Sequence, residues 1–275
     1  MALDQIDIEK HEAQMSFLEH LEELRWHIIR SLIAVSIGAS IAFYYGTYIF
    51  DKILLGPTQA DFWTFRKICE LSESIYSSDK ICVDKMEFVI KTMKVQEQFF
   101  QHMMIALLGG FVLALPYILY EIYRFIRPAL KSREKKYSGF AIAFASVLFF
   151  LGVLFGYFFL APISINFLGN YTLSEVIQKE FTVTSVVSLV TLLTIGAGIM
   201  FELPLVIYLL AKVGLVTAAT LRSYRKVALV VILIISAIIT PPDIASQILL
   251  ALPIMLLYEV GIFIAKRVEP TLDDI

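Results

Sequence analysis

Long apolar segments separated by shorter polar ones dominate the chain. A helix needs about 20 apolar residues to cross the hydrocarbon layer of a membrane. Six apolar segments lie near Trp26–Phe50, Phe99–Tyr123, Ser138–Ala161, Ser185–Ala211, Val227–Thr240 and Ile244–Ala265. The pattern therefore predicts an all-α polytopic membrane protein with six transmembrane helices, organised as a single integral membrane domain over residues 1–275.

The fifth segment is shorter than the others. Its 14 residues between Lys226 and Pro241 cover about 21 Å as a helix, against about 30 Å of hydrocarbon. Such a helix must pack against its neighbours, thin the bilayer or admit water at one end. Two prolines end the segment, and Asp243 can cap the helix that follows.

Composition supports the membrane assignment and argues against an enzyme. The chain is 58% hydrophobic and only 17% charged, with a mean hydropathy of +0.76, whereas soluble domains are about 25% charged. The four histidines show no ligand spacing, and the sequence contains no phosphate loop, nucleophile elbow or catalytic dyad. The first 14 residues are polar and acidic, so we expect no cleaved signal peptide.

Basic residues in the short loops predict the orientation. Loop 124–137 contains six Lys and Arg residues and loop 212–226 contains four, whereas loop 162–184 contains one. Short loops rich in Lys and Arg stay in the cytoplasm. We therefore expect both termini to be cytoplasmic and residues 51–98 to form an extracytoplasmic loop.

The long loop 51–98 contains two features of interest. Met86, Val89, Ile90, Met93 and Phe100 share one face at helical spacing, which predicts a helix on the membrane surface. The alternative is a hydrated loop with a fraying helix. The loop also contains both cysteines, Cys69 and Cys82, which form either a disulfide in an oxidising compartment or two free thiols.

Acidic residues cluster at the start of the first apolar segment. Glu19, Glu22 and Glu23 lie with Arg25 on the charged side of the amphipathic stretch 16–30. Carboxylates at such a place either dock guanidinium groups or form solvated local ion pairs. Glu134 lies in the basic run SREKK and is either neutralised by its neighbours or faces the Glu23 side.

Glu202 and Glu259 are the acidic residues that we place well inside apolar segments. Glu202 lies between Gly198 and Pro204, and its burial in a membrane is costly unless it faces protein or water. A proline also frees a backbone carbonyl, so we predict a polar pocket around Glu202. Glu259 either reaches the headgroups or pairs with Lys266.

Several ordered motifs resemble one known family. They are HLEELR at 20–25, PYILY at 116–120 followed by FIRPAL at 125–130, REKK at 133–136, FELP at 201–204, TPPDIASQ at 240–247 and ALPIMLLYEVGIF at 251–263. Together they resemble TatC, the multispanning subunit of the twin-arginine protein translocase, over nearly the whole chain.

The resemblance implies a receptor that exports folded proteins with the proton motive force. In this family Glu23 and Glu134 would be the acidic partners of the two signal-peptide arginines, and Arg25 and Phe125 would belong to the same cytoplasmic patch. Glu202 would lie on the concave face of a glove-shaped bundle, near the docking site of single-span TatA/TatB-type partners.

The family also implies short fifth and sixth helices, a bacterial inner-membrane location and a receptor complex containing several copies of this chain among membrane lipids. Asp243 and Gln247 would form a periplasmic cap. No cofactor, metal or nucleic acid is expected.

The chain departs from the family pattern at three places. Trp26 and His27 follow HLEELR where more basic residues are expected, Thr182 stands near a usual acid, and loop 51–98 is long. Two other functions compete with the receptor. A proton-coupled secondary transporter would use Glu202 but should show an internal repeat, which we do not find. An insertase or scaffold for membrane helices would not distinguish paired arginines from lysines.

Overall fold

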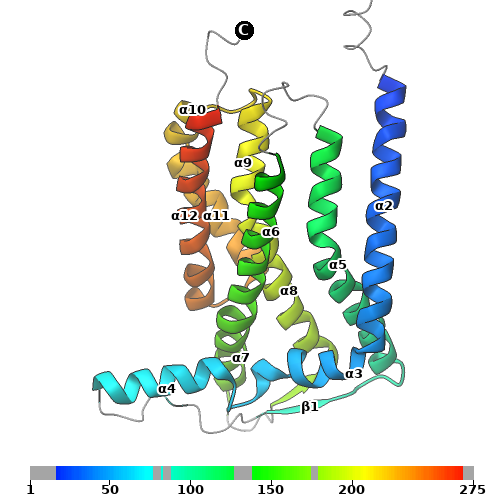
Figure 1. Cartoon of the computed structure of the whole chain (residues 1–275). Coiled ribbons are helices and arrows are strands. Elements are labelled where there is room, and N and C mark those ends of the chain that lie inside the picture. The colour runs from blue at the N-terminus through cyan, green and yellow to red at the C-terminus, as the bar shows by residue number, and fades with distance from the viewer. Residues whose placement is uncertain (1–16, 77–81, 83–87, 127–137, 175–178, 269–275) are drawn as a thin grey trace, which may run out of the picture.

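The structure, a computed structural model, describes residues 17–76, 82, 88–126, 138–174 and 179–268 (Figure 1). Its long helices are α2 (Phe17–Tyr44), α5 (Glu97–Ile126), α6 (Ser138–Phe155) continued by η6 (Gly156–Leu160) and α7 (Ala161–Asn170), α8 (Val183–Phe201) continued by α9 (Leu203–Lys212), α11 (Arg225–Ile239) and α12 (Ile244–Val268). The shorter elements are α3 (Gly46–Tyr48), η1 (Ile49–Leu54), η2 (Gly56–Thr58), α4 (Trp63–Tyr76), β1 (Val89–Lys91), β2 (Glu180–Thr182) and α10 (Ala218–Ser223).

The helices agree with the predicted all-α membrane fold. Among the described residues, five helical stretches are long and apolar enough to cross a membrane. The sixth, α11, has 15 residues and covers about 22 Å, so the short fifth helix is confirmed. The prediction that the last helix is also short is wrong, because α12 has 25 residues and covers about 37 Å. Pro241 and Pro242 lie in the break between α11 and α12, and Pro253 is accommodated inside α12.

The bundle has two distinct ends. The terminal end, at the top of Figure 1, is where α2 begins and α12 finishes. The loop end, at the bottom, contains α4 and the paired strands β1 and β2. An even number of crossings places the start of α2 and the finish of α12 on the same side of the bundle.

The loop end contains a strand where the sequence predicted a surface helix. Val89–Lys91 forms β1 and pairs in parallel with β2, Val89 opposite Glu180 and Lys91 opposite Thr182. Two consecutive β-branched residues favour an extended chain when a partner strand is available, and here the partner comes from beyond α7. Residues 83–87 lie outside the described part of the chain. A helix does lie across this end, but it is the earlier segment α4 (Figure 1).

Packing is uneven across the bundle. Leu193 of α8 and Leu250 and Ile254 of α12 are fully buried, whereas only 17% of the most apolar stretch of α2 is buried. Helix α2 packs mainly on α5. Their backbones touch at Gly38 and Gly110, where a Cβ on Gly38 would lie 2.8 Å from the carbonyl oxygen of Gly110. Small residues permit such an approach between membrane helices.

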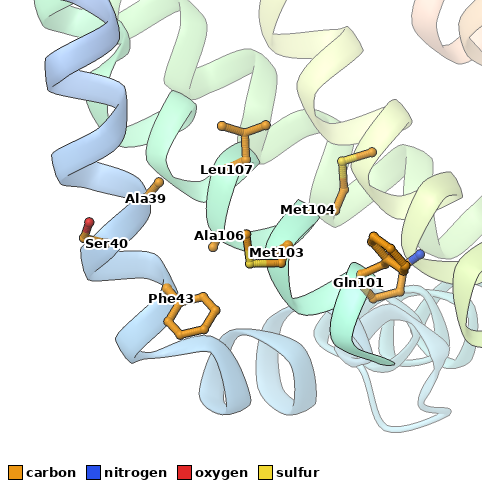
Figure 2. A pocket seen from close by; sticks show the side chains of 9 residues that line it. Ala39, Ser40, Phe43, Gln101, Met103, Met104, Ala106 and Leu107 are labelled. Atoms are coloured by element: carbon orange, nitrogen blue, oxygen red, sulfur yellow. The ribbon is translucent and has the colours of Figure 1, made fainter. Parts of the chain in front are cut away.

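On the loop-end side of this contact, α2 and α5 leave a groove of about 680 Å³ (Figure 2). Its lining is mainly apolar and comprises Ala39, Ser40, Phe43, Phe100, Gln101, Met103, Met104, Ala106 and Leu107. Such a lining suits contact with lipid chains.

Candidate functional site

The antiparallel register of α2 and α5 places the predicted recognition residues at one level. His27 contacts Glu121, and Gly38, eleven residues later on α2, contacts Gly110, eleven residues earlier on α5. The register therefore holds over three helical turns. Continued by one more turn toward the terminal end, it sets Glu23 opposite Phe125.

The described members of the predicted recognition patch differ in exposure. Arg25 is exposed, whereas Glu23 and Phe125 are half-buried. The Oε2 atom of Glu23 is buried and has no hydrogen-bond partner among the described residues. The ring of Phe125 lies edge-to-face on that of His27, 5.9 Å between centroids. Glu134 lies outside the described residues, so its position relative to Glu23 stays a prediction.

Sequence reasoning missed one acidic residue inside the second span. Glu121 is only 1% exposed and hydrogen-bonds to Nδ1 of His27 and to the hydroxyl of Tyr117. Nη1 of Arg30 lies 3.9 Å from the same carboxylate. Glu121 follows the motif residue Tyr120. Because it lies near the end of the apolar segment 99–123, the sequence alone did not indicate that it is buried. His27 and Arg30 on α2 were the signal in the sequence that could have indicated a buried acidic partner on α5.

A second groove between α2 and α5 lies beside this pair. It has a volume of about 770 Å³ and an almost wholly apolar lining that includes Leu24, Ile28, Leu32, Phe111, Ile118 and Ile122. His27, Glu121 and Phe125 also border it. The groove offers an apolar surface immediately adjacent to charged groups at the terminal end.

Glu202 occupies the junction of α8 and α9. Its side chain is 8% exposed, and neither carboxylate oxygen has a hydrogen-bond partner among the described residues. Pro204 follows in the first turn of α9 and is itself buried. The polar pocket expected around Glu202 is therefore not supplied by the described side chains.

Asp243 and Gln247 tie the short α11 to α12. The backbone N–H of Ser246 donates to Oδ1 of Asp243 at 2.6 Å, which caps α12. Nε2 of Gln247 donates to the carbonyl of Leu233 on α11 at 3.1 Å. Asp243 is 4% exposed and its Oδ2 has no partner among the described residues. These two residues position the two helices against each other.

At the other end of this helix pair, Glu259 forms an ion pair with Arg225, 2.6 Å between Nη2 and Oε2. The suggested pairing with Lys266 is therefore wrong. Position explains the difference, since Arg225 opens α11 at the level where α12 nears its end. The pair joins the two helices at the terminal end of the bundle.

The loop end is closed by internal bonds. Cys69 of α4 and Cys82 form a disulfide with a Cα–Cα distance of 4.8 Å. Glu97, at the start of α5, accepts hydrogen bonds from the backbone N–H and the hydroxyl of Thr184 in α8. Thr182, where the family pattern suggested an acid, caps α8 instead by accepting from the N–H of Ser185. The carboxylate at the start of α8 is therefore that of Glu97, which belongs to α5.

The fold and its sites define a polytopic helical membrane protein in which carboxylate oxygens of Glu23 and Glu202 have no partner in the described part of the chain. The family model described as Sec-independent protein translocase protein (TatC) matches residues 19–253. The chain therefore belongs to the TatC family of Sec-independent protein translocases, and it is a translocase component rather than an enzyme.

Relatives and solved structures agree along almost the full length. The TatC proteins of a Blattabacterium from Periplaneta americana and of Aquifex aeolicus are 38% and 37% identical to this chain. The matches cover 93% and 92% of this chain and 97% and 95% of the two relatives. A crystal structure of a twin-arginine translocase receptor TatC superposes with a TM-score of 0.69 at 37% identity, over 91% of this chain and 99% of the other.

Proposed function

We propose that this chain is the signal-peptide receptor of a twin-arginine translocase. It binds the paired arginines of the signal peptide at the terminal end of α2 and α5, on the cytoplasmic side of a bacterial inner membrane. Both of its termini are cytoplasmic, and loop 51–98 faces the periplasm. The relatives named as twin-arginine translocase receptors support this proposal.

The observation that carries the proposal is the carboxylate of Glu23. Its buried Oε2 has no hydrogen-bond partner among the described residues, and Arg25, two residues along the helix, lies on a different side of it. A guanidinium group can satisfy a carboxylate with two parallel hydrogen bonds, which a lysine ammonium cannot do. Glu134 would provide the second carboxylate, and Phe125 and Arg25 would border the same patch.

Binding of a signal peptide tests this proposal. Glu23→Ala should weaken binding by about 2–5 kcal/mol, the cost of removing one partner of a desolvated charge pair. The peptide with paired lysines should bind the wild-type chain more weakly than the peptide with paired arginines. Glu22→Ala is the matched control, because Glu22 is an exposed acid on the same helix. Wild-type affinity in both Glu23→Ala and Glu134→Ala would refute the proposal.

We further propose that Glu202 receives a single-span TatA/TatB-type partner helix, and that several copies of this chain assemble in the receptor complex. Both carboxylate oxygens of Glu202 have no partner among the described residues. A buried carboxylate in a membrane protein is costly when it lacks a hydrogen-bond donor. A partner helix with a polar side chain at the same depth would supply one.

A further inference from the structure

A buried hydrogen-bonded pair joins the two helices that carry Glu23 and Phe125. His27 of α2 is 6% exposed and Glu121 of α5 is 1% exposed, and Nδ1 of His27 hydrogen-bonds to Oε2 of Glu121. The Tyr117 hydroxyl and Arg30 complete the surroundings of this carboxylate. The receptor function proposed above does not use these side chains.

Helix α2 has few other constraints at this level. It stands at the edge of the bundle (Figure 1), and its apolar stretch is 17% buried compared with 39% for α12. The Gly38–Gly110 contact and the hydrogen bond between His102 and the carbonyl of Phe43 hold α2 against α5 at mid-membrane and at the loop end. Neither contact reaches the first turns of α2. A buried hydrogen bond is directional and is strengthened by a low dielectric. The His27–Glu121 pair therefore sets the rotation of α2 at its terminal end, beyond the Gly38–Gly110 contact.

The pair lies one helical turn from the proposed recognition residues. Glu23 precedes His27 by four residues and Phe125 follows Glu121 by four, so each lies above one member of the pair on the same helix face. The ring of His27 also contacts that of Phe125. A rotation of α2 by one residue, about 100°, would turn Glu23 away from Phe125.

We propose that His27 and Glu121 are positioning residues, which hold α2 and α5 in one register and rotation so that Glu23 and Phe125 face the signal peptide together. This inference rests on the receptor function proposed above. Glu121 is not itself a binding residue, because it is buried and its carboxylate already has partners on α2 and α5. Glu23 differs in having a buried oxygen without a described partner.

The experiment measures binding of peptides with paired arginines or paired lysines to the full chain in lipid nanodiscs. Glu121→Leu removes the pair, Glu121→Gln keeps an acceptor of the same shape for His27, and the double exchange His27→Glu with Glu121→His rebuilds the pair in reverse. The matched control is Glu259→Leu, which breaks another interhelical pair, Arg225–Glu259, far along the chain from α2 and α5.

We expect Glu121→Leu to weaken binding of the paired-arginine peptide about tenfold, equivalent to about 1.4 kcal/mol, and to reduce the preference over paired lysines. Glu121→Gln, the exchanged pair and Glu259→Leu should retain affinity within about threefold, or about 0.6 kcal/mol. If Glu121→Leu does not accumulate in the membrane, His27→Leu removes the pair from the α2 side and is measured in its place, with the same expected loss.

Two results would overturn the inference. If Glu121→Leu keeps the wild-type affinity and the wild-type preference for paired arginines over paired lysines, the His27–Glu121 pair does not position Glu23 and Phe125. A loss in Glu121→Gln and in the exchanged pair as large as that in Glu23→Ala would show that Glu121 contacts the peptide directly. Glu23→Ala in the same assay separates the receptor proposal from the positioning proposal. Wild-type affinity of the Glu23→Ala variant would contradict the receptor proposal, whereas the results for Glu121 test only the positioning role of His27 and Glu121.

Discussion

Glu97 at the loop end and Glu202 inside the membrane region are buried to the same extent, with 7% and 8% of their surface exposed. Their surroundings are opposite. Glu97 accepts hydrogen bonds from the backbone N–H groups of Met93 and Lys94 at 2.7 and 3.2 Å, and from the N–H and hydroxyl of Thr184 at 3.0 and 2.7 Å. Glu202 has no hydrogen-bond partner for either carboxylate oxygen among the described residues.

The difference separates a structural acid from one available for binding. A buried charge stabilises a fold when its own chain satisfies it, and it is a liability when the chain does not. Glu97 joins the β1–α5 connection to the first turn of α8 and so holds the loop end together. Glu202 has no such donor among the described residues. Loss of the carboxylate should therefore lower the stability of the fold at Glu97 and raise it at Glu202.

Replacing Glu97 should give the largest loss of stability. Glu97→Leu leaves the donors of Met93, Lys94 and Thr184 without their acceptor, and buried donors without partners are costly. We expect the midpoint of thermal unfolding of the purified chain to fall by several degrees. The midpoint should fall less in Glu97→Gln, because the amide keeps one acceptor oxygen. A midpoint unchanged in Glu97→Leu would mean that the carboxylate does not hold the loop end.

The disulfide is a second internal bond at the loop end, and its removal should affect stability but not peptide binding. Cys69 and Cys82 are separated by 13 positions, and closing a loop of this size is worth about 3 kcal/mol in the chain-entropy model. In intact cells both thiols should resist alkylation until a reductant is added.

Labelling of these cysteines without reductant would show that the bridge is absent in the cell. Labelling only by a reagent confined to the cytoplasm would also contradict the proposed orientation. The variant Cys69→Ser should keep the affinity for the paired-arginine peptide, because α4 lies at the opposite end of the bundle from Glu23 (Figure 1).

Periodicity and length were sufficient to predict most of the architecture. Five long apolar helices and the short α11 follow from runs of apolar residues whose lengths are set by the membrane. The strand β1 could not be predicted in this way. Val89 and Ile90 fit one face of a helix equally well, and the partner strand at Glu180–Thr182, far along the chain, decides in favour of an extended backbone.

The candidate site was predictable only in part, for a similar reason. The motif residues Glu23 and Phe125 are recognisable in the sequence, and the register that sets them at one level follows once α2 and α5 pair. The burial of Glu121 depends on His27 and Arg30 of another helix. From the sequence alone, a carboxylate near the end of an apolar segment is interpreted as a contact with lipid headgroups. Its burial is recognised once the facing helix is known.

Replacing Glu202 should give a smaller effect on stability, and of the opposite sign. Glu202→Leu removes a buried carboxylate without a described partner, so the isolated chain should gain about 1–2 kcal/mol. The same variant should lose site-specific cross-linking to a TatA/TatB-type helix, because leucine offers no hydrogen bond. Glu202→Gln should retain part of the cross-linking, since an amide can still bond to a polar partner. The readouts are the thermal midpoint of the purified chain and cross-linking yield in membranes. Wild-type cross-linking in both variants, or a destabilised Glu202→Leu chain, would place Glu202 with Glu97 among the structural acids and remove the contrast between them.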